Sequence, residues 1–238
     1  MLAAFCALVL IGALGFTGLL LVTPSVASAP ALVRTQDLAH DAPYPGPPVP
    51  PRFAAALIAT EDHRFYSEPG IDLFAVARVG WSYLSGQGDQ GGATLYQQLA
   101  KVLYTPGRTG PAVEAEQVAL AVKLYLTYSP AQILQMYSDA VYFGNGYYGL
   151  ATASCGYFGV PPRAMSWPQA ALLAGLVQAP SLDDPLRYPA NARAREEHVF
   201  ARLVATGKMT PAAARAALAV PVGRLVRRAG TGCAAASA

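Results

Sequence analysis

The pattern of apolar and polar positions divides the chain into an apolar N-terminal run, a proline-rich segment and a long helical region. From Leu2 to Val22 almost every residue is apolar, and Thr17 is the polar exception. About 20 apolar residues in a helix cross the hydrocarbon core of a bilayer. We therefore predict a single-pass membrane signal anchor over residues 1–23.

A cleaved signal peptide is the alternative interpretation of the apolar run. Ala27, Ser28 and Ala29 have the small-x-small form of a cleavage site. The run is long for the core of a signal peptide, which favours the anchor. Charge does not decide the orientation, because no Lys or Arg precedes the run and Arg34 follows it.

Residues 24–52 are expected to form a proline-rich linker. Six of the twelve residues from Asp41 to Arg52 are proline, which excludes a helix interior or a central strand there. After Arg52 the chain is rich in Ala and Leu at helical spacing, without the sustained alternation typical of strands. We predict a mainly helical, all-α domain over residues 53–218 and a basic, flexible tail over residues 219–238.

Helix start signals subdivide this domain. Ser129, Pro130 and Gln132 form a capping box with proline at the first helical position. The apolar residues that follow recur at helical spacing and predict one buried stripe: Ile133, Met136, Tyr137, Ala140 and Val141. Similar signals predict helices after Ser166 and Thr210, and a helix from Asp72 to about Leu84.

Composition narrows the classes of function. Among 238 residues there are 17 Lys and Arg and 14 Asp and Glu, and 53% of the residues are hydrophobic. This excludes a disordered chain, and a net charge of +3 is weak for a nucleic-acid binder. Cys6, Cys155 and Cys233 are too few and scattered for a disulfide scaffold or a zinc site, and we expect Cys155 to be packed core.

Acidic residues are scarce, so the position of Glu61 and Asp62 is informative. They end an apolar helical stretch shortly before a turn at Pro69 and Gly70. A carboxylate at the rim of a cleft would be partly desolvated, which raises its pKa towards that of a useful general base. The alternative is a solvated helix end with an ion pair to Arg64.

A polar run follows two glycines, Gly91 and Gly92. A loop that leads into a helix N-terminus offers free N–H groups to an anion. Four polar residues then share one helical face: Thr94, Gln97, Gln98 and Lys101. This face predicts a sugar or phosphate surface, and an ordinary solvated face is the alternative.

Together these motifs resemble those of the peptidoglycan glycosyltransferases. The matching stretches are ALIATEDHRFYSEPGID, GGATLYQQLAK and ILQMYSDAVYFGNGYYGL, and the resemblance runs from about Pro50 to Leu218. It implies a lysozyme-like domain, behind the membrane helix, that polymerises lipid II on the extracytoplasmic side of the cell membrane. The implied partners are lipid II, the growing glycan chain, the membrane and other cell-wall synthesis proteins, and no nucleic acid.

The resemblance also implies roles for individual residues. Glu61 matches the general base that deprotonates the 4-hydroxyl of the acceptor sugar. That hydroxyl displaces undecaprenyl diphosphate from C1 of the donor chain with inversion. The residues implied to contact lipid II are Asp62, Phe65, Gly91, Gly92, Thr94, Gln97, Gln98 and Lys101.

The third family motif, R-K-x-x-E, is altered in this chain. Its charged positions fall on Val113, Glu114 and Gln117. Glu116 lies one residue away, about 100° around a helix, and is the expected replacement for the second catalytic Glu. Arg108 could restore part of the lost positive charge. The resemblance implies no cofactor with certainty, and a divalent cation at the diphosphate is left open.

We therefore expect a membrane-anchored, monofunctional peptidoglycan glycosyltransferase, since no transpeptidase domain follows residue 218. A second hypothesis, favoured by the altered motif, is an impaired domain that binds lipid II or a synthase as a regulator. A third is a hydrolase that cuts glycan, which the motif from Gly91 to Lys101 opposes.

Overall fold

The structure is a computed structural model that describes residues 2–67, 93–223, 225, 227 and 233. Within these residues the chain is helical, and one isolated antiparallel bridge joins Tyr142 to Tyr148. The prediction of an all-α domain is confirmed. The predicted helix from Asp72 to about Leu84 lies outside the described residues.

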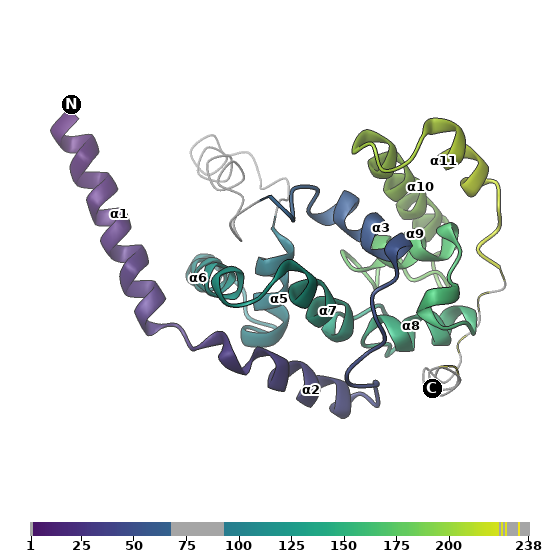
Figure 1. Ribbon diagram of the computed structural model, residues 1–238, viewed down its shortest axis with the longest axis horizontal. Coiled ribbons are helices and arrows are strands. Elements are labelled where there is room, and N and C mark those ends of the chain that lie inside the picture. The colour runs from purple at the N-terminus through teal and green to yellow at the C-terminus, as the bar shows by residue number, and fades with distance from the viewer. Residues whose placement is uncertain (1, 68–92, 224, 226, 228–232, 234–238) are drawn as a thin grey trace.

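The N-terminal part begins with α1 (Leu2–Val22), which projects away from the other helices in Figure 1. Among the described residues, no single helix meets the length and hydropathy required of a membrane span. The bent pair Leu14–Val22 and Val26–Ala39 meets them together, with a bend of 45°. The anchor over residues 1–23 therefore stays a prediction.

The predicted linker over residues 24–52 is corrected in its first half. A 3-10 turn (Val26–Ser28) leads into α2 (Ala29–Ala39), and Val33 in this helix is fully buried. The Gln36 side chain donates a hydrogen bond to the carbonyl of Ala140 at 2.6 Å. Residues 29–39 can form a helix because their one proline, Pro30, lies in the first turn. A backbone N–H in that turn has no partner inside the helix, so its absence costs nothing.

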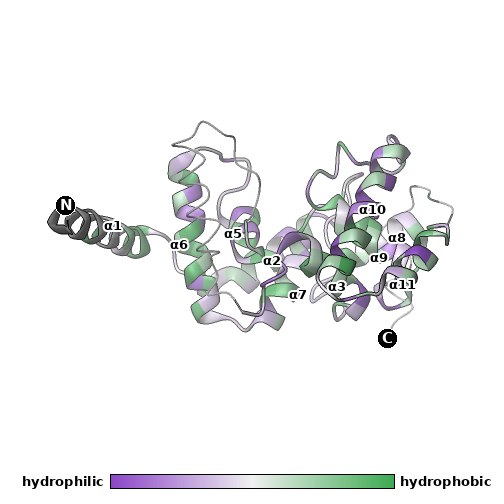
Figure 2. Cartoon of the chain, turned by 90° about the horizontal axis from the view of Figure 1, so that it is seen from above, coloured by the Kyte–Doolittle hydropathy of each residue, from purple (hydrophilic) through white to green (hydrophobic). Residues whose placement is uncertain are grey.

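Eight further α-helices and a 3-10 turn (Pro162–Ala164) make up the helical structure in the described part of the domain. The α-helices are α3 (Pro51–Glu61), α5 (Leu95–Tyr104), α6 (Pro111–Thr127), α7 (Pro130–Ala140), α8 (Leu150–Phe158), α9 (Trp167–Leu176), α10 (Pro189–Ala205) and α11 (Pro211–Leu218). Helix α3 packs on α9 and α10, and α5 packs on α6 and α7. Figure 2 shows these as two neighbouring groups, with α2 and α7 near the middle of the molecule.

The predicted start signals mark real helix starts. Ser129 and Ser166 each form a capping box, with Gln132 and Gln169 respectively, and Thr210 accepts a hydrogen bond from the Ala213 amide. Side chains at these positions accept backbone N–H groups that have no partner inside the helix. The predicted stripe on α7 is buried at all five positions.

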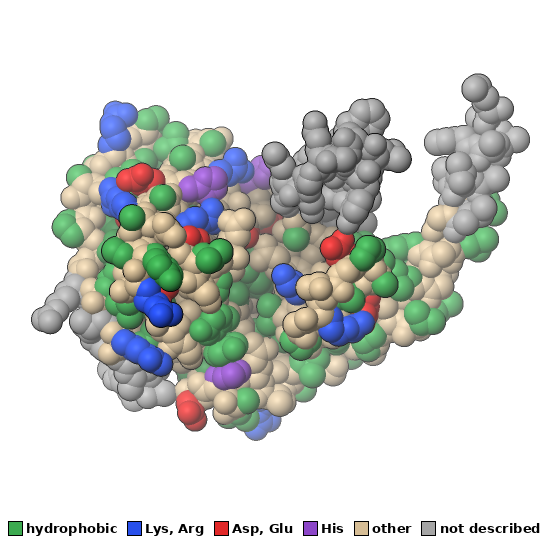
Figure 3. Space-filling view, turned by 180° about the vertical axis from the view of Figure 1, so that it is seen from behind, with side chains coloured by type: hydrophobic (Ala, Val, Ile, Leu, Met, Phe, Trp, Pro, Cys, Tyr) green, Lys and Arg blue, Asp and Glu red, His purple; other side chains and the backbone are tan. Residues whose placement is uncertain are grey.

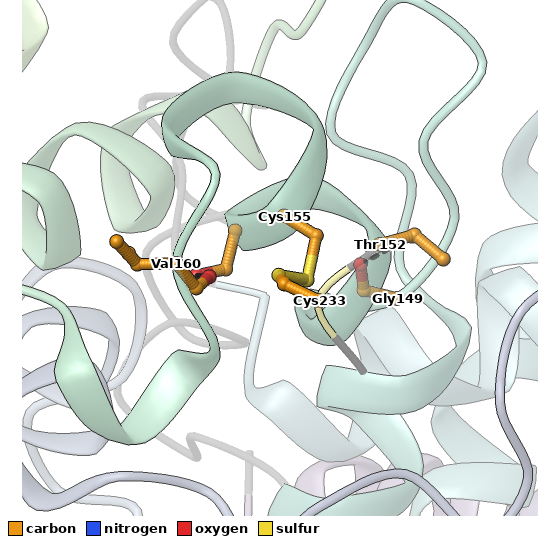
Figure 4. The surroundings of a disulfide bond; sticks show 6 residues. Gly149, Thr152, Cys155, Val160 and Cys233 are labelled. Carbon is orange, nitrogen blue, oxygen red and sulfur yellow. Dashed lines mark hydrogen bonds between the residues drawn. A yellow bond between two sulfur atoms is a disulfide. The ribbon is translucent and has the colours of Figure 1, made fainter. Parts of the chain in front are cut away.

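The C-terminal segment is held to the domain, which corrects the expectation of a flexible tail at the residues described. Cys233 forms a disulfide with Cys155 on α8, 78 residues away in the sequence (Figure 4). The Gln169 side chain donates to the carbonyl of Val222 at 3.2 Å, and Leu225 packs against the core. Cys155 is buried as expected, but it is also covalently bonded.

Reduction of this disulfide is expected to destabilise the domain. A disulfide that closes a long loop contributes about 2–4 kcal/mol, chiefly by restricting the unfolded chain. Dithiothreitol should therefore lower the free energy of unfolding in urea for the wild type and leave that of Cys233→Ser unchanged. Equal wild-type stability with and without reductant would contradict the bond.

Candidate active site

Glu61 lies at the end of α3, where the helix meets α5. The apolar side chains of α3, among them Phe53 and Leu57, are fully buried and fix the helix in the domain. The helix ends because Asp62 leaves the helical conformation, with φ −155° and ψ 72°. The Gln98 side-chain nitrogen donates a hydrogen bond to Glu61 Oε2 at 3.0 Å.

The pKa of the half-buried Glu61 carboxyl is set by opposing effects. Burial raises this pKa above its ordinary value of 4.5, because loss of water disfavours the charged form. The hydrogen bond from Gln98 and the positive charge of Arg195 lower it, but burial is the larger effect. The raised pKa expected from the sequence is thus found, and it suits a general base.

Asp62 connects α3 to the start of α5. Its Oδ2 atom accepts the backbone N–H of Leu95 at 2.9 Å, and its side chain is buried. Thr94 and Gln97 form a capping box at the same helix end, with bonds of 2.9 and 3.2 Å. The expectation of free N–H groups here is corrected at Leu95 and Gln97, because the protein's own oxygens accept them.

The other predicted lipid II contacts differ in their surroundings. Phe65 is a core residue whose ring centroid lies 5.3 Å from that of Tyr96. Lys101 is exposed on α5, one turn beyond Gln98. Gly91 and Gly92 lie outside the described residues. The contacts of all these residues with substrate stay predictions.

Glu116 and Arg108 form an ion pair, with 2.9 Å between Arg108 Nη2 and Glu116 Oε2. Arg108 lies in the turn between α5 and α6, and Gln117 donates to Thr105 Oγ1 in the same turn at 2.7 Å. The Arg108 side chain is 54% exposed, and exposed pairs contribute only about 0–1 kcal/mol to stability. The main effect of this ion pair is therefore to hold the Arg108 guanidinium in place, and its contribution to the stability of the fold is small.

Helix α10 brings positively charged side chains close to α3, which the sequence only partly predicted. Arg195 Nε donates to the carbonyl of Gly175 at 3.3 Å, and Arg202 Nε donates to the carbonyl of Ala59 on α3 at 3.1 Å. Burial and these two arginines lower the pKa of His198, which lies between them on α10. Figure 3 shows basic and acidic side chains on both parts of this face of the molecule.

The donor groups of the described chain bear on whether it could hold a metal ion. Within it, no three His, Cys, Asp or Glu side chains form a group that could hold a metal ion. Glu61 is bonded to Gln98 and Glu116 to Arg108. A divalent cation at the diphosphate therefore stays a prediction.

Comparisons with known proteins agree on one family. The family model described as "Transglycosylase" matches residues 33–204. A candidate transglycosylase from Cupriavidus necator is 30% identical over 213 residues, which cover 87% of this chain and 91% of that protein. Penicillin-binding protein 1A of Streptococcus oralis is 35% identical over 178 residues, which cover 73% of this chain and 28% of that protein.

The match to solved structures is more limited. Penicillin-binding protein 1A from Haemophilus influenzae aligns with a TM-score of 0.39 and 22% identity, over 56% of this chain and 16% of that one. The chain thus spans less than a third of the length of these two penicillin-binding proteins, and most of the length of the Cupriavidus protein.

Substitution of Asp62 should destabilise the junction of α3 and α5. Asp62→Ala leaves the buried N–H of Leu95 without its acceptor, and a hydrogen bond to a charged group is worth about 1.5–3 kcal/mol. Asp62→Asn keeps an acceptor oxygen and should lose less. Urea denaturation measures both, and an Asp62→Ala variant as stable as wild type would contradict this role.

Proposed function

This chain belongs to the transglycosylase family, and we propose that it is a peptidoglycan glycosyltransferase whose substrate is lipid II. The observation that carries the proposal is the Glu61 carboxyl, which is half-buried, raised in pKa and held by Gln98. A group of this kind can take a proton from a sugar hydroxyl near neutral pH.

In the proposed reaction, the 4-hydroxyl oxygen of the acceptor sugar attacks C1 of the donor chain. The hydroxyl proton passes to the carboxylate of Glu61. The bond from C1 to the diphosphate oxygen breaks, and undecaprenyl diphosphate leaves with the bonding electrons. Attack from the opposite face inverts the configuration at C1, and Glu61 then releases its proton to solvent.

The leaving diphosphate carries negative charge that cationic side chains would stabilise. Lys101 on α5 and Arg108 after α5 are the side chains we assign to this task. We assign Glu116, the predicted second acidic residue, to hold the guanidinium of Arg108, which its ion pair supports. In this arrangement Glu116 acts through Arg108.

The N-terminal segment supports the proposal of a retained membrane anchor. Lys123 Nζ on α6 donates to the carbonyls of Thr23 and Pro24 at 2.7 and 3.1 Å. The Tyr128 hydroxyl donates to the carbonyl of Val26 at 2.9 Å, and Ala29 is fully buried. Within the alternative cleavage site, Ala29 is thus buried and the Ala27 carbonyl accepts a second bond from Tyr128 at 3.2 Å, whereas the Ala27 and Ser28 side chains are exposed.

The disulfide supports the extracytoplasmic side of the membrane. Disulfides form and persist in oxidising compartments and are rare in the cytosol. We therefore propose a single-pass protein of the cell membrane, whose domain meets lipid II and the growing glycan chain outside the cytoplasm. Contacts with other cell-wall synthesis proteins remain predictions from the sequence.

The regulatory hypothesis rests on the altered third motif. Val113, at the position of the family Arg, is buried, and Glu114 stands at the position of the Lys. The bond between Glu61 and Gln98 opposes this hypothesis, because a domain that only binds has no need of a base. Lipid II binding without polymerisation would favour it, and release of soluble muropeptides from sacculi would favour the hydrolase.

Glu61→Gln is expected to slow polymerisation of labelled lipid II by about 10²–10⁴-fold, because the amide cannot accept the proton. The assay uses the full-length chain purified in detergent. Glu197→Gln, at an exposed position on α10, is the matched control and should keep wild-type activity. A fall of less than about tenfold in Glu61→Gln would contradict the assignment of the base.

Lys123→Met is expected to loosen the residues that follow α1. Loss of the bonds to Thr23 and Pro24 should speed proteolytic cleavage between residues 23 and 29 several-fold in membranes. N-terminal sequencing of the products locates the cut. Lys208→Met, in an exposed turn, is the matched control, and equal cleavage of the two variants would contradict the role of Lys123.

A further inference from the structure

A chain of two hydrogen bonds connects the buried core to Glu61. The Tyr137 hydroxyl on α7 donates to Gln98 Oε1 at 2.6 Å, and Gln98 Nε2 on α5 donates to Glu61 Oε2 on α3 at 3.0 Å. Tyr137 is almost fully buried. Three helices thus contribute one group each to a single polar line.

The contacts of Gln98 define the direction of its amide. The nitrogen faces two acceptors, the Glu61 carboxylate and the Ala93 carbonyl at 3.4 Å. The oxygen faces the Tyr137 hydroxyl. If the amide were reversed, its oxygen would face the Glu61 carboxylate and the Ala93 carbonyl. All three oxygens carry negative charge or partial negative charge, so this arrangement is unfavourable.

Tyr137 can serve as a permanent donor in this position. Burial raises the pKa of its hydroxyl well above the usual 10, so the O–H bond is intact at every working pH. Without this donor, the amide oxygen of Gln98 would lose its buried partner, which is costly for a polar atom. The side chain would then turn towards water and away from Glu61.

The hydroxyl adds little to packing. The ring of Tyr137 belongs to the buried stripe of α7, which includes Ile133 and Ala140, and a phenylalanine ring would fill the same space. A buried tyrosine hydroxyl needs a hydrogen-bond partner, and here the partner is the amide that contacts the proposed base.

We propose that Tyr137 is a positioning residue for the glycosyl transfer: through Gln98 it orients the Glu61 carboxyl and favours its charged form. The proposal rests on the function proposed above, in which Glu61 is the base. Tyr137 is almost fully buried, so its removal should act through Gln98 and change the ionisation of Glu61 even when no lipid II is present.

The test is a titration of the full-length chain in detergent, with ¹³C-labelled glutamate carboxyls observed by NMR. The Glu61 signal is assigned by its loss in Glu61→Gln. Tyr137→Phe should raise the proton affinity of the Glu61 carboxylate about tenfold, because the carboxylate loses its amide donor. The acid limb of the polymerisation rate should move to higher pH by the same amount.

Two variants keep the result specific. Tyr157→Phe removes another buried hydroxyl, which lies on α8 and donates to the Phe143 carbonyl at 2.9 Å, and should leave the Glu61 titration unchanged. Gln98→Leu removes the donor itself and should raise the pKa at least as much as Tyr137→Phe. In the Gln98→Leu background, Tyr137→Phe should add nothing.

A Glu61 pKa that is the same in wild type and Tyr137→Phe would overturn the proposal. An equal shift in Tyr137→Phe and Tyr157→Phe would also overturn it, because the effect would then be a general loss of structure. The titration measures the ionisation of Glu61 without any reaction of lipid II. It is therefore independent of the polymerisation assay that tests the proposed function. If Glu61→Gln still polymerised lipid II, the proposed base would fail whatever the titration showed.

Discussion

The junction between the end of α3 and the start of α5 is the constraint on which the site depends. Glu61 and Asp62 are consecutive, yet Asp62 holds the backbone at Leu95 and Glu61 bonds the side chain of Gln98. Leu95 and Gln98 are three residues apart, so one turn of α5 presents both partners to α3. A slip of α5 by one residue would rotate Gln98 by about 100° and break both bonds.

The role of base proposed for Glu61 requires that burial and hydrogen bonding have opposite effects on its pKa. A fully solvated carboxyl near its ordinary pKa of 4.5 holds a proton too weakly to be an effective base at neutral pH. A buried carboxyl without donors would stay protonated and could accept nothing. Gln98 and Arg195 limit the rise that burial causes, and Gln98 is itself fixed from the core. The pKa of Glu61 is therefore set by neighbouring protein groups as well as by burial.

Local signals in the sequence predicted the helix starts and the place of Glu61, because a capping box lies within four residues and an acid that ends an apolar run is conspicuous. The features that were not predicted join residues far apart in the chain. The disulfide spans 78 residues and the bond from Tyr137 to Gln98 spans 39. No spacing pattern in a sequence predicts which such residues come into contact. From the sequence alone, Tyr137 was predicted only as one of the apolar positions of a buried helix stripe.

The altered third motif can be understood as a change in where the positive charge originates. Val113 is buried, so a cation could not reach the surface from that position. Arg108 supplies a cation from the preceding turn, which two side-chain bonds from α6 hold in place, one from Glu116 and one from Gln117. Recognition of a diphosphate depends on charged donors within hydrogen-bond reach, and not on which backbone segment carries them. The relocation therefore does not by itself remove the positive charge that a diphosphate needs, whether the domain polymerises lipid II or only binds it.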